Sequence, residues 1–220
     1  AEDERGASAH AVQEAPAVLE LARASGDSDL ELAAYYIQAS ALRRTGHHER
    51  ARTVTERGLE RARLLGNGSQ ECALSTLLAG IETERGDPMS SQRLLRQALA
   101  LSQSIGNQLQ ECTIQGNLGV AALDLGWLPE AQESLAAALP LSRALGRRGF
   151  EATLLLNQSA AHLAESRAAS ALAIAEQATA LAVPQSNRSD PSGGTPPARG
   201  LGRMATTNRD SVASPEAMAG

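Results

Sequence analysis

Lysine is absent from this 220-residue sequence, and all 20 of its basic residues are arginine. The absence excludes sites that depend on a lysine amine, such as the phosphate-binding P-loop, the protein-kinase ATP site and the Schiff base of pyridoxal phosphate. Aromatic residues make up only 2% of the chain. Because sheets are built largely from aromatic and β-branched residues, this shortage argues against a β protein.

Long apolar runs and familiar catalytic motifs are absent as well. No stretch approaches the ~20 apolar residues that a membrane-spanning helix needs, and residues 1–10 lack the layout of a signal peptide. The net charge of −5 opposes binding to nucleic acid. No HExxH, GxSxG or GxGxxG motif occurs. We therefore expect a cytoplasmic protein that is not an enzyme, with no cofactor or metal and no membrane or nucleic-acid partner.

What the sequence does contain is a helical repeat. Alanine and leucine, with 42 and 31 residues, are abundant and favour helices. Glycine ends helices because it adopts the left-handed backbone conformation without a Cβ clash. The spacing predicts helices of about 16–17 residues joined by turns of about three. These glycines recur every 20 residues, at Gly6, Gly26, Gly46, Gly66, Gly86, Gly106, Gly126 and Gly146.

The full repeat is 40 residues long and contains two helices, because the pairs Glu71–Cys72, Glu111–Cys112 and Glu151–Ala152 recur at 40 residues but not at 20. Small residues recur at one position of each helix, and small facing residues let two helices approach closely. They are Ala39, Ala79, Gly119 and Ser159 on the first helices, and Ala51, Ser91, Ala131 and Ala171 on the second.

Several residues mark where helices begin or are interrupted. Asp87–Pro88 is typical of an N-cap followed by proline at the first helical position, and Pro129 suggests the same start after Gly126. Pro16 and Pro140 fall inside predicted helices, where Pro140 either kinks its helix or lies on the solvent side. Ser166 stands where the register expects glycine, so we expect a degenerate last unit that caps the array.

The repeat divides the chain into four hairpins with flanking segments. Residues 1–28 are expected to be the second helix of a truncated hairpin, which suggests a piece of a longer protein; the alternative is a lone capping helix. Residues 184–220 are rich in Ser, Pro and Gly, and we predict that they are disordered. The four hairpins are predicted at about 29–66, 69–106, 109–146 and 149–183.

The segment NLGVAALDLGWLPEAQESLAAAL (117–139) resembles a tetratricopeptide repeat. Leu118–Gly119, Gly126, Glu130–Ala131, Leu135 and Ala138–Leu139 have the spacing of that family. The resemblance extends in weaker form over residues 6–182 and implies an all-α fold, a right-handed α-solenoid of stacked antiparallel hairpins. The unit is six residues longer than usual. It is similar to repeats in large bacterial signalling proteins, and arginine in place of lysine also suggests a bacterial genome.

The resemblance implies a concave groove lined by the first helices, which binds an extended peptide or a protein. Asn117 and Asn157 match the position at which family members contact a ligand backbone. Arg43 and Arg44 either bind a ligand carboxylate or form a solvated pair. The positions used by carboxylate-clamp members hold no basic residue here. By register, the groove residues are Tyr36, Ile37, Ser40, Arg43, Arg44, Thr76, Leu77, Gly80, Glu84, Asn117, Val120, Asp124, Leu156 and Asn157.

Histidine and cysteine remain as candidates for chemistry. No further metal ligands converge on His47 and His48, so we interpret them as part of a solvated turn. Cys72 and Cys112 occupy equivalent positions of neighbouring units, about 8–10 Å apart, which is too far for a disulfide. We expect both to be buried packing residues in a reducing compartment.

The function expected from these features is a non-enzymatic protein-binding or peptide-binding scaffold. The alternative is a sensory or regulatory arm of a larger transcription activator or signalling enzyme, whose partners are other domains of the same protein. A third possibility is self-association through the apolar face of residues 10–25.

Overall fold

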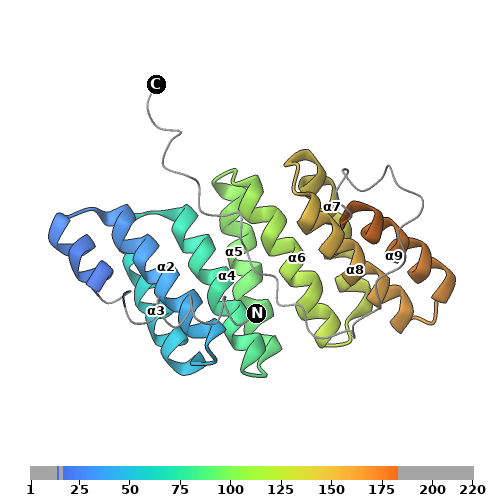
Figure 1. Cartoon of the computed structure of the whole chain (residues 1–220), viewed down its shortest axis with the longest axis horizontal. Helices are drawn as coiled ribbons and strands as arrows, with labels where there is room; N and C mark the ends of the chain where they lie inside the picture. The colour runs from blue at the N-terminus through green and yellow to red at the C-terminus, as the bar shows by residue number, and fades with distance from the viewer. Residues whose placement is uncertain (1–13, 15–16, 183–220) are drawn as a thin grey trace, which may run out of the picture. The chain divides into compact units, whose positions relative to one another are not determined.

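A computed structural model describes residue 14 and residues 17–182 of the chain. All regular elements in this part of the chain are helices, so the predicted all-α class is confirmed. Residues 17–25 form a helix that precedes eight longer ones, which follow one another side by side in Figure 1. These are α2 (Ser28–Arg44), α3 (His48–Leu65), α4 (Gly68–Glu84), α5 (Pro88–Ser104), α6 (Gln108–Asp124), α7 (Leu128–Ala144), α8 (Arg148–Ala164) and α9 (Ala168–Ala182).

Each break between helices coincides with the predicted glycine. From Gly26 to Gly146, the seven glycines of the register have φ between +65° and +87°. After each stop the chain forms the same hydrogen bonds: the amide of Gly126 donates to the carbonyl of Leu123 (3.0 Å), and the amide of Trp127 donates to that of Ala122 (2.8 Å). These bonds satisfy carbonyls at the helix C-terminus. The prediction that glycine defines the helix ends is confirmed.

The turn at residue 166 keeps this geometry without glycine. Ser166 has φ +62° and is the non-glycine residue with positive φ among the described residues. Its amide donates to the carbonyl of Leu163, and the amide of Arg167 donates to that of His162, both at 2.9 Å. The expectation of a degenerate last unit is therefore wrong for this hairpin, because the bonds that close the helix are formed by the backbone.

The two helices of each hairpin touch at the predicted small residues. A Cβ atom at Gly119 on α6 would lie 2.6 Å from Cγ of Leu135 on α7. In the last hairpin, the hydroxyl of Ser159 donates to the carbonyl of Ala171 at 2.7 Å. Ala39 and Ala51 have no exposed surface. Close packing of the helices therefore depends on these residues being small.

Helix starts agree with the sequence signals in one case and differ in another. The carboxylate of Asp87 accepts from the amide of Ser90 (2.9 Å), and α5 begins at Pro88 as predicted. α7 begins one residue before Pro129 and has no side-chain cap. It continues through Pro140, which is exposed, so the solvent-side alternative applies there.

Contacts between hairpins give the array an inner and an outer wall. The first helices contact one another in the pairs α2–α4, α4–α6 and α6–α8, whereas the pairs α3–α5, α5–α7 and α7–α9 make no contact. The hairpins are therefore closer together on the side of the first helices, which form the inner wall. Apolar clusters cross these junctions, for example from Cys72 on α4 to Leu95 on α5 and Ile114 on α6.

A polar pair also recurs at each turn between hairpins. The glutamate near the start of a first helix accepts a hydrogen bond from a side chain eight residues earlier. The pairs are Arg23–Glu31 (3.2 Å), Arg63–Glu71 (2.7 Å), Gln103–Glu111 (2.9 Å) and Arg143–Glu151 (2.7 Å). These side-chain pairs repeat every 40 residues and join consecutive hairpins, in agreement with the predicted period.

Some expectations concern residues outside the described part of the chain. They are the predicted disorder of residues 184–220 and the placement of Gly6, His10 and Pro16 in a truncated first hairpin. In the part that the structure describes, no helix is both long and apolar enough to span a bilayer.

Candidate functional site

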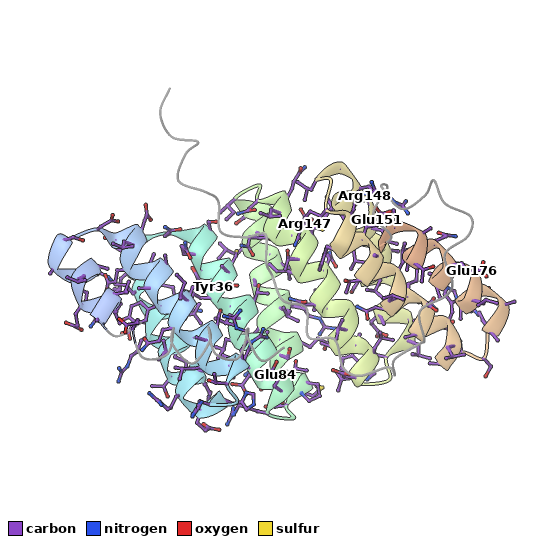
Figure 2. The ribbon with its side chains drawn as sticks, viewed as in Figure 1. Tyr36, Glu84, Arg147, Arg148, Glu151 and Glu176 are labelled. Carbon is purple, nitrogen blue, oxygen red and sulfur yellow. The ribbon has the colours of Figure 1, made fainter. Side chains whose placement is uncertain are left out.

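The predicted groove residues of α2 include exposed and packed side chains. Ile37 is 48% exposed and Arg44 is also exposed, while Ser40 is half-buried. Tyr36 is half-buried and packs against the apolar clusters that α2 shares with α3 and α4, as its position in Figure 2 shows. The part of α2 that is open to a ligand is therefore Ile37, Ser40 and Arg44.

Arg43 is engaged within the protein. Its Nη1 lies 3.6 Å from Oε1 of Glu84 on α4, and its side chain is only 16% exposed. Gly80 makes room for the guanidinium, because a Cβ atom at that residue would lie 2.7 Å from Nη1. Neither predicted alternative holds for Arg43, since its carboxylate partner is Glu84 rather than a ligand and it is not a solvated side chain.

Glu84 also connects this pair to the neighbouring turn. Its Oε2 lies 3.4 Å from Nδ1 of His48, the first residue of α3. Arg43, His48 and Glu84 thus join α2, α3 and α4. His48 therefore has a structural contact, whereas His47 is exposed as the solvated-turn interpretation predicts. No group of three or more metal-ligating side chains occurs among the described residues.

Leu77 is a core residue rather than a groove residue. It is 6% exposed and packs in a cluster with Ala39 and Leu42 of α2. Its position on α4 faces the preceding first helix, so packing between hairpins covers it. The sequence register located the correct helix but did not separate the side that faces the neighbouring hairpin from the side that faces the groove.

The remaining groove residues lie on α4, α6 and α8. Thr76, Asn117, Val120 and Asn157 are half-buried, Asp124 is exposed, and Leu156 is 41% exposed. This part of the inner wall is uncharged from Thr76 to Val120 apart from the engaged Glu84. Amide groups both donate and accept hydrogen bonds, so they can pair with the backbone of an extended peptide.

A contact that the sequence did not reveal joins α6 to α8. The guanidinium carbon of Arg147 lies 4.3 Å from the centre of the Phe150 ring, and Nη1 donates to Oγ1 of Thr113 at 2.8 Å. Phe150 fills the space beside Gly116, where a Cβ atom would lie 2.7 Å from its Cζ. Figure 2 shows Arg147 at the start of α8. The available sequence signal was the glycine opposite the single phenylalanine of the chain.

The two cysteines are unsuited to nucleophilic chemistry. Cys72 and Cys112 are free thiols with no exposed surface. Each lies 3.6 Å from a carbonyl of the second helix of its own hairpin, Ala98 for Cys72 and Ala138 for Cys112. Burial raises the pKa of Cys72 to about 11, and it also raises the pKa of Cys112 although Arg147 opposes the shift. The prediction that both are unpaired packing residues is confirmed.

A shallow depression lies away from the inner-wall residues. Its volume is about 280 Å³, and it includes the buried carboxylate of Glu31, which accepts hydrogen bonds from Arg23 (3.2 Å) and Arg61 (2.8 Å). Because the carboxylate is already paired with two guanidinium groups, we interpret the depression as a structural junction between residues 17–25, α2 and α3.

No protein-family model matches the sequence, and no curated protein matches it either. Solved structures do resemble this one. BtubC from P. vanneervenii has a TM-score of 0.65 at 16% identity, covering 94% of this chain and 98% of its own. A putative kinesin light chain of Podosopora anserina, with nearly identical TPR-like repeats, has a TM-score of 0.64 at 19% identity, covering 84% and 92%. The chain has the fold of a tetratricopeptide-like repeat array.

A third similar structure belongs to a larger protein. The signal transduction ATPase with a tetratricopeptide repeat sensor from Pyrococcus horikoshii has a TM-score of 0.64 at 15% identity. The similarity covers 82% of this chain but 31% of that one. At these identities the similarities show the fold, so the function has to be argued from the surface of the molecule.

Proposed function

We propose that this tetratricopeptide-like array is a non-enzymatic scaffold that binds a protein or an extended peptide along its inner wall. The observation that carries the proposal is the contact between successive first helices, because it brings residues from four repeats onto one continuous surface. Exposed apolar side chains on that surface, such as Ile37, provide area that a ligand can bury.

The polar groups of this wall fit a peptide ligand. Asn117 and Asn157 are at equivalent positions of neighbouring repeats, so a chain in extended conformation can meet both amides in turn. Arg44 and Asp124 carry opposite charges on α2 and α6, which favours one direction of binding. The free cysteines are consistent with a cytoplasmic location.

Selection from a phage library of random peptides, followed by calorimetric titration of the selected peptides, tests this proposal. The double variant Asn117→Ala with Asn157→Ala, and separately Ile37→Asp, should weaken binding at least tenfold. Leu64→Asp on α3 is the matched control, because Leu64 is 75% exposed and lies on a second helix. Equal loss of binding in the control, or no enriched peptide, would count against an inner-wall site.

A second candidate function is that of a sensory or regulatory arm within a larger signalling protein. The similarity to the repeat sensor of the P. horikoshii ATPase favours it. In that case the partner is another domain of the same polypeptide. An ATPase, cyclase, kinase or DNA-binding domain in the complete reading frame would support this candidate, and its absence there would leave the free scaffold.

A further inference from the structure

Three leucines are exposed on the last hairpin of the described chain. Leu156 and Leu163 on α8 are 41% and 60% exposed, and Leu172 on α9 is 62% exposed. Exposed leucines are common singly, but these three lie on the two helices that end the array, at the far end from α2 in Figure 1.

The repeat register shows what these positions do in an earlier hairpin. Forty residues before Leu156, Gly116 contacts Phe150 and Leu154 of the following hairpin. Forty residues before Leu163, Leu123 packs into the cluster that contains Leu154 and Leu155. Leu172 follows Gln132 by the same interval, and Nε2 of Gln132 donates to Oε2 of Glu165 at 2.6 Å. All three leucines therefore occupy the face on which the next hairpin would pack.

The residue types at these positions make the face more apolar than its counterparts. The position of Leu172 holds arginine or glutamine in the first three hairpins, namely Arg52, Gln92 and Gln132. The position of Leu163 holds Arg43 and Thr83 before Leu123. A terminal repeat that faces water is expected to be more polar than the interior ones. The change to leucine is the opposite of what a solvent-facing end requires.

We propose that this terminal face, formed by Leu156, Leu163 and Leu172, joins two copies of the chain in a two-fold dimer. The inference is independent of the proposed inner-wall function, and it assigns Leu156 to the terminal face. A further hairpin is a poor occupant, because Leu156 replaces the glycine that accepts Phe150 in the preceding junction. Projecting leucines pack instead against an identical leucine face, as a two-fold interface requires.

The charges around the face are compatible with this pairing. Thr153, Ala160 and Ala175, at the same face of α8 and α9, carry no charge that could repel a second copy. Glu176 lies on α9, as Figure 2 shows, and Arg167 precedes the same helix. An antiparallel arrangement of α9 about Leu172 places the end that carries Arg167 beside the end that carries Glu176 in the other copy, so opposite charges meet.

Sedimentation equilibrium of the full 220-residue chain tests the dimer. The expected mass is twice that of the 22.9 kDa chain, and Leu163→Glu or Leu172→Glu should weaken self-association at least tenfold. Leu21→Glu and Leu64→Glu are matched controls, since these residues are 70% and 75% exposed on other helices. A monomer at all concentrations, an open series of oligomers, or dissociation by Leu21→Glu instead would overturn the proposal.

A disulfide experiment supplies a second measurement that does not depend on stability. Because Cys72 and Cys112 are buried, oxidation of a Leu172→Cys variant should crosslink two copies through the new thiol alone. Leu64→Cys is the control and should remain uncrosslinked under the same conditions. Equal crosslinking of both variants would show random collision and would overturn the two-fold contact at α9.

Discussion

Replacing Ser166 by glycine should stabilise this protein, although serine makes no strained contact there. Ser166 has φ +62° and sits in the same turn geometry as the glycines. A left-handed conformation costs a residue with a Cβ atom about 1–2 kcal/mol. Glycine recovers this cost but loses about 0.4–1 kcal/mol through the greater freedom of the unfolded chain. The net gain expected for Ser166→Gly is therefore about 0.5–1 kcal/mol.

The reverse substitution at the preceding turn provides a matched control. Gly146 has φ +68°, and no atom lies within 4 Å of the position that a Cβ atom would take. Gly146→Ser therefore tests backbone strain alone, without a steric clash. We expect it to lower stability by about as much as Ser166→Gly raises it.

Thermal unfolding followed by circular dichroism measures both effects. One kcal/mol corresponds to a Tm change of about 2–4 °C in a domain of this size, so Tm should rise by about 1–4 °C for Ser166→Gly and fall similarly for Gly146→Ser. If neither variant changes Tm, or if both change it in the same direction, the glycine register does not act through left-handed helix ends.

Three further predictions concern packing, acid stability and thiol reactivity. Gly119→Leu should destabilise the protein by about 1–3 kcal/mol in urea unfolding, because even a Cβ atom there lies 2.6 Å from Leu135; a neutral result would contradict the tight crossing of α6 and α7. Burial raises the pKa of Glu31, but hydrogen bonds from Arg61 and Arg23 outweigh it and hold that pKa below its ordinary range. Its stabilisation is therefore present at neutral pH and lost as pH falls through the lowered pKa, so Glu31→Gln should lower Tm at pH 7 and match the wild type below about pH 3; a constant difference would refute the ion pairing. Cys72, with its pKa raised to about 11, should react with a thiol reagent only after unfolding, and rapid labelling of the native protein would show that α4 opens.

Sequence periodicity predicted most of the fold because the dominant interactions are local. A glycine decides within its own residue whether a helix can end, and small residues such as Gly119 and Ala131 decide how closely neighbouring helices can pack. The same local nature explains Ser166, where backbone hydrogen bonds to Leu163 and His162 reproduce the turn without the residue that the register expects.

The binding surface was less predictable, because exposure depends on the neighbouring hairpin. Leu77 and Ile37 occupy the same register position, yet Leu77 packs against α2 while Ile37 is 48% exposed. Arg43 was a reasonable ligand-binding residue in the sequence, but Gly80 and Glu84, about 40 residues away in the chain, provide its site. No periodicity encodes such pairings, since each depends on which side chain the next hairpin presents.

The amino-acid sequence by itself determined the helices, their ends and their pairing into hairpins, because those features follow from backbone preferences and from residues close together in the chain. Only the tertiary structure decided which side chains face the inner wall, which become core and which remain exposed at the terminal face. The reason is physical: burial is a property of the space between elements, and that space exists only once the hairpins are stacked.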